Sequence, residues 1–449
     1  MQVTETLSEG LKREYKVVVP AAELDAKVNA RLDELKDRVR INGFRPGKVP
    51  VTHLKRMYGR SAMAEVIEAT VRDTNNQIVS ERGYKLAADP KVTLPTDEGA
   101  IEQLIAGKTD LYYTMALEIV PPIALGDFKS IKLTKLAADV TDDEIEQGIA
   151  RIVDQNKPYT ARPEGEKAAK DDRVTISFAG TIDGTPFEGG SGDAVVLIGS
   201  NTFIPGFEDQ LIGIATGETR TLKVTFPVHY VKQDLAGKTA EFVVKAKSIE
   251  TPGTVAADDD FAKSLGLESI AKLREAVKGT ITREHATMSR QKLKRALLDE
   301  LDTMHKFDPP PTLVEEEFQR VWKSVLQELE NEGKSFADEG TSEEKAKAEY
   351  HTIAERRVRL GLVLAEIGEK NKITVTEDEL SRAVMERARQ FAGQEQRVWD
   401  YYRHNPQAIA ALRAPIFEEK VVDFLLELAG VTERKVSRED LYKEDDSAL

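Results

Sequence analysis

The residue types that usually carry covalent chemistry are scarce or scattered in this chain. It contains no cysteine, which excludes disulfides, thiolate metal sites and cysteine nucleophiles. Gly107-Lys108-Thr109 matches the end of a phosphate-binding loop, but Glu102 stands where that loop needs its first glycine, so we interpret the segment as a turn. The histidines are far apart and form no HExxH pair: His53, His229, His285, His305, His351 and His404. We therefore expect no metal and no cofactor.

Aromatic residues and glycines recur between residues 171 and 249 in a fixed order. The motifs are Phe178-Ala179-Gly180-Thr181, then Asp183-Gly184-Thr185-Pro186-Phe187-Glu188, then Phe203-Ile204-Pro205-Gly206-Phe207-Glu208, and then Phe226-Pro227 followed by Tyr230. Periodicity alone favours the simpler interpretation, in which these rings fill the core of a β domain. The ordered set, however, resembles the FK506-binding type of prolyl isomerase over the whole segment.

This resemblance implies a pocket for proline with Phe207 as its floor. Carried over position by position, it assigns the following residues to the pocket: Phe178, Phe187, Glu188, Phe203, Ile204, Phe207, Tyr230 and Phe242. Rotation about an X-Pro bond meets a barrier of about 20 kcal/mol because amide resonance must be lost. An apolar pocket favours the twisted amide, whose charge separation is smaller, and a hydroxyl such as that of Tyr230 steadies the carbonyl. Such an isomerase needs neither a nucleophile nor a cofactor.

Two positions depart from the family pattern. Ala194 stands where the family commonly has an aromatic residue before the Gly199 turn. Glu188 stands where the smaller free-standing isomerases usually have aspartate. We therefore expect a wider or weaker pocket and modest isomerase activity.

A basic segment lies near the N-terminus of a chain whose net charge is -14. Residues 36–60 hold eight basic side chains against Asp37 alone, and within them residues 43–50 read GFRPGKVP. Cations on a loop neutralise phosphates and an exposed aromatic fills a pocket on a partner, although the charge alone favours a merely solvated basic turn. The sequence of this segment resembles the ribosome-binding signature loop of bacterial trigger factor. That resemblance implies contacts to a large-subunit protein and ribosomal RNA near the exit tunnel through Gly43, Phe44, Arg45, Pro46, Gly47 and Lys48.

Several domains must position these residues, because 449 residues exceed the usual size of one core. Residues 14–19 and 111–120 read as strands, and residues 21–40 and 61–82 read as helices. Asn42-Gly43, Pro46-Gly47 and Pro50 break the chain between the two helices. We expect an N-terminal α+β domain over residues 1–120, followed by a connecting segment over residues 121–168 with a helix at residues 142–155.

A central β domain with a short helix is expected over residues 169–252. Its predicted strands are residues 173–178, 194–198, 219–226 and 240–249, and Asp183-Gly184 is a strong hairpin signal.

Helical periodicity dominates from residue 261 to about residue 429, which predicts an all-α domain with helical arms over residues 253–432. The predicted breaks are residues 308–311, residues 333–341 and Asn405-Pro406. An apolar stripe on one helix is typical of ordinary packing, with an open client surface as the alternative: Phe318, Val321, Trp322, Val325 and Leu329. We expect residues 433–449 to form a charged, flexible tail.

The resemblance to trigger factor extends over essentially the whole chain and implies a function. It implies an ATP-independent chaperone, partly ribosome-bound, that holds nascent and unfolded polypeptides, assists folding and export, isomerises X-Pro bonds and forms a homodimer when free. No run of about 18 apolar residues and no signal-peptide pattern occurs, so we expect a cytoplasmic protein without membrane contact. Two alternatives stay open, a dedicated isomerase with dimerising helices and a holding chaperone whose central domain binds proline without turning it over.

Overall fold

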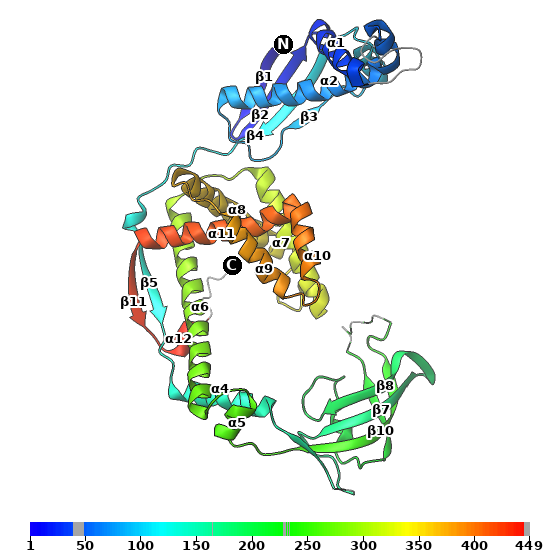
Figure 1. Ribbon diagram of the computed structural model, residues 1–449, viewed down its shortest axis with the longest axis vertical. Helices are drawn as coiled ribbons and strands as arrows, with labels where there is room; N and C mark the ends of the chain where they lie inside the picture. The colour runs from blue at the N-terminus through cyan, green and yellow to red at the C-terminus, as the bar shows by residue number, and fades with distance from the viewer. Residues whose placement is uncertain (39–48, 164, 228–229, 231, 233, 444–449) are drawn as a thin grey trace. The chain divides into compact units, whose positions relative to one another are not determined.

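The computed structural model describes residues 1–38, 49–163, 165–227, 230, 232 and 234–443. Contacts divide the chain into two units, and most of their elements are labelled in Figure 1. The first unit combines Met1–Gly126 with Leu301–Val321 and Ala348–Val421. The second combines Asp127–Glu300 with Trp322–Lys347 and Val422–Leu449. Each unit therefore collects segments that are far apart in sequence.

The N-terminal segment forms an antiparallel sheet with helices. Its strands, in the order β1-β2-β4-β3, are β1 (Gln2–Glu9), β2 (Lys12–Val19), β4 (Leu111–Glu118) and β3 (Lys91–Thr93). Its helices are α1 (Ala21–Arg38), α2 (Val51–Arg82) and α3 (Glu98–Ile105). Alternate residues of β2, Tyr15, Val17 and Val19, are fully buried in one core with Leu24 and Leu32 of α1. The predicted α+β domain is confirmed.

Two boundaries in this segment differ from the sequence-based prediction. Helix α2 begins at Val51, ten positions before the predicted start at residue 61, because Pro50 takes an extended conformation and the chain turns directly into the helix behind it. Strand β1 was not predicted, since most of its residues are exposed and it carries little apolar alternation.

The central domain is a sheet around one long strand. Its path runs β6 (Tyr159–Ala161), β10 (Thr239–Pro252), β7 (Arg173–Ile182) and β8 (Thr185–Leu197), and β9 (Thr219–Thr225) also pairs with β10. Asp183 and Gly184, with φ values of 50° and 79°, form the predicted tight hairpin between β7 and β8. A short 3-10 helix, η2 (Asp209–Leu211), follows the loop after β8. Strand β6 lies within residues 121–168, which we predicted to be a connecting segment with one helix.

Three helices that flank the central domain along the chain form a separate core: α4 (Asp142–Gln155), α5 (Asp259–Ser264) and α6 (Ile270–Met304). The bounds of α4 agree with the prediction, and Thr141 and Glu144 form a capping box at its start. Ile145 and Ile149 of α4 are buried in one cluster with Leu273 and Val277 of α6. Gly148 permits this approach, because a Cβ there would lie 2.7 Å from Val277 Cγ1.

The prediction of a flexible tail from residue 433 is wrong for the part of the tail that the structure describes. Strand β11 (Gly430–Lys435) pairs in parallel with β5 (Lys132–Ala137), and α12 (Arg438–Tyr442) follows with Leu441 fully buried. All residues of β11 are exposed and its last three are charged, which is why the composition predicted a loose tail.

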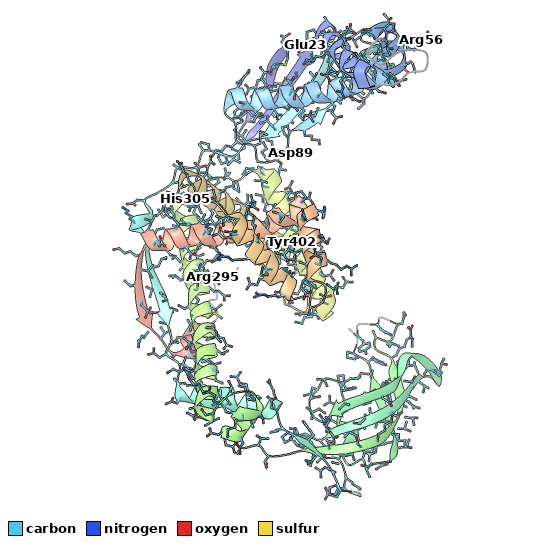
Figure 2. The ribbon with its side chains drawn as sticks, viewed as in Figure 1. Glu23, Arg56, Asp89, Arg295, His305 and Tyr402 are labelled. Atoms are coloured by element: carbon cyan, nitrogen blue, oxygen red, sulfur yellow. The ribbon has the colours of Figure 1, made fainter. Side chains whose placement is uncertain are left out.

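The remaining helices are α7 (Pro311–Glu332), α8 (Glu343–Lys370), α9 (Glu377–Arg389), α10 (Glu395–His404) and α11 (Pro406–Leu428), and η1 (Phe128–Ser130) precedes β5. All three predicted breaks coincide with boundaries between helices, and Pro311 and Pro406 are the first residues of α7 and α11. Where α6 ends, His305, labelled in Figure 2, donates from Nδ1 to Leu301 O at 2.8 Å and accepts from Gly126 N at 3.3 Å. None of the helices described in the structure is long and apolar enough to cross a membrane.

The apolar stripe of α7 is mostly packed. Phe318, Trp322 and Leu329 are all less than a tenth exposed. The Trp322 ring stacks on Phe336 with centroids 5.2 Å apart. The stripe therefore serves ordinary helix packing, which was the favoured interpretation.

Candidate active site

The central domain contains a cavity of about 450 Å³ that gathers all eight residues predicted for the proline pocket. Strands supply four of them, Phe178 from β7, Phe187 and Glu188 from β8, and Phe242 from β10. The loop between β8 and η2 supplies Phe203, Ile204 and Phe207, and the connection between β9 and β10 supplies Tyr230. Residues up to 64 positions apart thus line one cavity.

Phe207 is the most enclosed of the predicted pocket residues. Its side chain is 3% exposed, and its ring stacks on Phe203 with centroids 5.5 Å apart and planes 18° apart. The Phe242 ring stands at 84° to it, with centroids 5.6 Å apart. Stacked and edge-to-face contacts are the arrangements that aromatic pairs prefer, so these rings support one another.

Phe242 is the hub of the aromatic set. Phe178 and Phe187 also contact it, with centroid distances of 6.1 Å and 6.0 Å. Gly180 on β7 makes room for this ring, because a Cβ at that position would lie 2.5 Å from Phe242 Cε1. The Phe178-Ala179-Gly180-Thr181 motif thus needs glycine at position 180, because any side chain there would clash with the Phe242 ring.

The cavity has further lining residues that the sequence motifs did not predict. Phe226 is 2% exposed and lies against Tyr230 and Phe187, with centroid distances of 4.7 Å and 5.9 Å. Phe226-Pro227 is one of the motifs that resemble the prolyl isomerase family, but we did not predict Phe226 as a pocket residue. The other lining residues that were not predicted are Gly189, Thr202, Pro205, Pro227, Lys232 and Leu235.

The rim of the cavity is polar on one side. The exposed residue Glu188 lies there, and its backbone carbonyl accepts a hydrogen bond from Lys232 Nζ at 3.2 Å. Ala194 is half-buried, pairs with Ile176 in the sheet and packs against the domain core, but it does not line the cavity. The small side chain at position 194 therefore does not widen the pocket directly.

A cavity with these walls can bind an apolar ring and exclude water from it. Apolar surroundings favour a less polar twisted amide over the planar amide, and prepositioned rings avoid the entropy cost of ordering them on binding. The site therefore has the chemistry of binding and conformational change rather than of bond cleavage.

The predicted ribosome-binding residues Gly43, Phe44, Arg45, Pro46, Gly47 and Lys48 lie outside the described residues. The segment that follows them is fixed, because Val49 is 1% exposed within the N-terminal core and Pro50 precedes α2.

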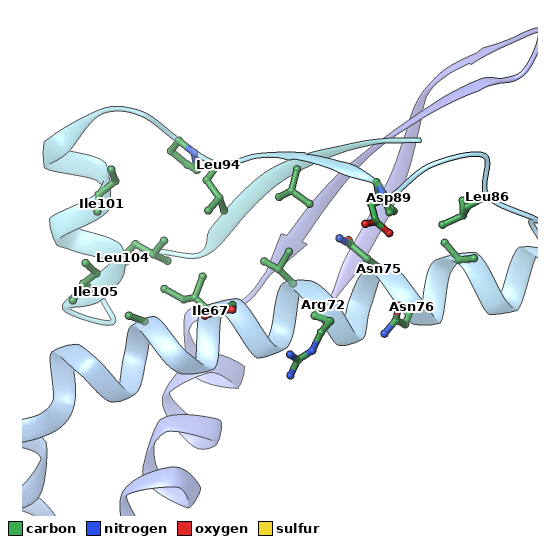
Figure 3. A pocket seen from close by; sticks show the side chains of 17 residues that line it. Ile67, Arg72, Asn75, Asn76, Leu86, Asp89, Leu94, Ile101, Leu104 and Ile105 are labelled. Carbon is green, nitrogen blue, oxygen red and sulfur yellow. The ribbon is translucent and has the colours of Figure 1, made fainter. Parts of the chain in front are cut away.

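A larger cavity, of about 730 Å³, lies in the N-terminal segment between α2, α3 and the strand β3 region (Figure 3). Its walls are mainly aliphatic and include Ile67, Val71 and Leu104, while Leu94 and Ile101 at its edge are more than a third exposed. None of the predicted site residues that the structure describes lies in it. Cavity size alone therefore does not locate the proline pocket.

Family models match the chain in three consecutive parts. The model described as bacterial trigger factor protein (TF) matches residues 1–152, and that for the bacterial trigger factor protein (TF) C-terminus matches residues 269–427. Between them, residues 164–247 match FKBP-type peptidyl-prolyl cis-trans isomerase. The central match contains the whole aromatic cavity.

Curated relatives match over the full chain. Trigger factor of Bradyrhizobium sp. (strain ORS 278) is 61% identical over 447 residues, which cover 99% of each protein. Trigger factor of Afipia carboxidovorans is 62% identical over 447 residues, again 99% of each. A solved structure described as "Promiscuous Substrate Recognition in Folding and Assembly Activities of the Trigger Factor Chaperone" shares the fold with a TM-score of 0.51 and 18% identity, covering 95% of this chain and 99% of that one.

Proposed function

This chain belongs to the bacterial trigger factor family, and on that basis we propose that it binds the ribosome near the exit tunnel and holds nascent chains there while it isomerises their X-Pro bonds. It is a chaperone that carries an FKBP-type peptidyl-prolyl isomerase domain. The observation that carries the proposal is the combination of the GFRPGKVP segment in the N-terminal part with an aromatic pocket in the central part.

The ribosome contact is assigned to Gly43, Phe44, Arg45, Pro46, Gly47 and Lys48. Arg45 and Lys48 attract RNA phosphates, and Phe44 fills an apolar pocket on a large-subunit protein. The next residue along the chain, Val49, is buried in the N-terminal core, which supports assigning the contact to this domain.

Isomerisation is assigned to the aromatic cavity, with Phe207 as the floor for the proline ring. Phe203, Phe242 and Phe226 form walls, and the Tyr230 hydroxyl donates to the carbonyl of the twisting amide. The pocket binds the twisted form better than the planar forms, which lowers the barrier without covalent chemistry.

Client holding is assigned to the helical domain and needs no ATP. Apolar side chains that are more than a third exposed occur on α7, α9 and α10 and in the segment between α9 and α10: Leu326, Met385, Phe391 and Tyr401. Dispersed apolar contacts of this kind suit weak recognition of many unfolded sequences in the cytoplasm and during export. A homodimer of the free protein would cover such surfaces.

Ribosome co-sedimentation tests the proposal. We expect a Phe44→Ala, Arg45→Ala and Lys48→Ala triple variant to lose most of its ribosome binding, because both the anchor and two phosphate contacts are removed. Lys16→Ala with Lys91→Ala is the matched control, since it removes two exposed positive charges from the same domain and should bind normally.

Undiminished co-sedimentation of the triple variant would overturn the docking assignment and favour a dedicated isomerase. A wild-type protein that suppresses aggregation but shows no turnover of a proline peptide would favour a pure holding chaperone.

A further inference from the structure

Glu208 directly follows the pocket floor Phe207 and is buried, with 5% of its surface exposed. Its carboxylate is surrounded by donors from one loop. Oε2 accepts from the backbone N–H groups of Gly199 and Asn201, both at 2.9 Å. Oε1 accepts from Thr202 N at 2.9 Å, from Phe203 N at 3.1 Å and from Ser200 Oγ at 3.0 Å. Five consecutive residues therefore donate to one side chain.

The conformation of this loop explains why it needs such a partner. Gly199 and Asn201 have φ values of 93° and 56°, the left-handed region that glycine and asparagine tolerate best. The resulting turns point successive N–H groups inward, where no strand pairs with them. Backbone donors left without an acceptor are costly, and the carboxylate supplies the acceptor for four of them.

The same loop forms a wall of the pocket. Thr202, Phe203, Ile204 and Pro205 all line the cavity, and the Phe203 ring stacks on Phe207. Glu208 is bonded to the backbone N–H of Phe203 and is the chain neighbour of Phe207. One residue thus links both members of the ring stack.

We infer that Glu208 is a positioning residue of the isomerase, which fixes the 199–203 loop so that the Phe203 wall stands in place before a proline enters. This inference rests on the proposed assignment of isomerisation to the aromatic cavity. Glu208 does not touch the substrate in this role, and it acts through the rings of Phe203 and Phe207.

The carboxylate carries a charge in this position. Burial alone would raise the pKa of Glu208, but the hydrogen bonds from Asn201, Phe203, Ser200 and Gly199 outweigh burial and lower the pKa below its usual value. The groups that face it in the described structure are amides and a hydroxyl, which do not titrate near neutral pH. At neutral pH the ionised carboxylate therefore accepts the hydrogen bonds that hold the 199–203 loop, and these bonds weaken only when acid protonates Glu208.

The test is the activity of Glu208→Gln and Glu208→Asp in a protease-coupled isomerisation assay. Glutamine keeps the shape of the side chain, but its amide NH2 group faces backbone N–H groups and cannot accept hydrogen bonds from them. We therefore expect kcat/KM to fall about tenfold. Aspartate keeps the charge on a shorter side chain and should restore part of this loss.

Glu218→Gln is the matched control. Glu218 also accepts from a backbone N–H, that of Ala215 at 2.8 Å, and pairs with Arg220 in the same domain. Ala215 does not line the cavity, whereas Thr202 and Phe203, which donate to Glu208, do. We expect it to lower the thermal stability without changing kcat/KM.

Wild-type activity in Glu208→Gln would overturn the inference, and so would equal activity losses in Glu208→Gln and Glu218→Gln. If Glu208→Gln does not fold, Glu208→Asp decides the question, since a reduced kcat/KM at wild-type thermal stability supports the role and an unchanged kcat/KM contradicts it. Unchanged activity in Phe207→Ala, in contrast, would refute the site assignment itself.

Discussion

At the scale of single residues, the pocket is held open by contacts between its own rings. Phe242 touches Phe178, Phe187, Phe207 and Phe226, with centroid distances between 5.6 Å and 6.4 Å. Aromatic pairs of this geometry each stabilise a structure by about 0.5–1.5 kcal/mol beyond the area that they bury. The rings are therefore ordered before a substrate enters, which lowers the entropy cost of binding.

Tyr230→Phe tests the proposed hydroxyl while the ring stays in place against Phe226. We expect kcat/KM to fall by about two- to tenfold, the effect of one neutral hydrogen bond to the twisting amide. Protease-coupled isomerisation measures it. Tyr159→Phe on β6 is the control and should be neutral, because that residue lies outside the cavity. Equal activity in Tyr230→Phe and wild type would show that the hydroxyl takes no part.

The sequence located the pocket residues well because the family motifs preserve their order and spacing. All eight predicted residues line one cavity. Phe226 and Glu208 were quoted within motifs without a pocket role. The bonding of Glu208 depends on the φ values of Gly199 and Asn201, which periodicity and composition do not reveal.

At the scale of elements, local signals placed most helices and hairpins. The bounds of α4 and the Asp183-Gly184 hairpin follow from nearby residues, as a capping box and a turn dipeptide do. The pairing of β11 with β5 joins Thr432 to Thr134, a contact across most of the chain that no local pattern indicates. That is why residues 433–443 were mistaken for a loose tail.

Glu379 in the first turn of α9 links this helix to α11. Lys420 Nζ donates to its carboxylate at 2.8 Å, and Thr376 N donates at 2.7 Å. The hydrogen bond from Lys420, followed by those from Thr376, lowers the pKa of Glu379 from 4.5 to about 2. Because the folded-state pKa is the lower one, its stabilising contribution is present above about pH 4.5 and is lost as the pH falls toward 2.

Glu379→Gln should therefore lower the Tm at pH 7, and its difference from wild type should shrink toward zero near pH 2. Thermal unfolding followed by circular dichroism over this pH range measures it. Glu377→Gln is the control in the same helical turn, where the carboxylate is largely exposed and contacts Arg413 at 3.4 Å. A Tm difference that does not change with pH in Glu379→Gln would contradict the assignment.

At the scale of the whole molecule, the central domain is an insertion with adjacent ends. Strand β6 pairs with the last residues of β10, and Gly253 N donates to Pro158 O at 2.7 Å. The chain therefore enters and leaves the central domain at neighbouring points. The cores of the N-terminal segment and of the α4–α6 cluster contain no residue from this domain.

Removing residues 159–252 and joining Pro158 to Gly253 through a short glycine-serine linker should leave the rest of the protein folded. We expect the variant to lose proline turnover and to keep suppressing the aggregation of an unfolded client, measured by light scattering. Loss of suppression in a variant whose helical content is normal would show that the central domain takes part in holding.

The central claim is that the aromatic cavity turns X-Pro bonds, and Phe207→Ala tests it most directly. We predict that kcat/KM in the protease-coupled assay falls at least about tenfold, because the floor that binds the proline ring is removed. Truncation of a buried phenylalanine also costs about 3–5 kcal/mol of stability, so Phe207→Leu is measured beside it and Val243→Ala, an exposed neighbour of Phe242, is the control. Ribosome co-sedimentation should not change in any of the three. Proline turnover at the wild-type rate in folded Phe207→Ala and Phe207→Leu would contradict the account.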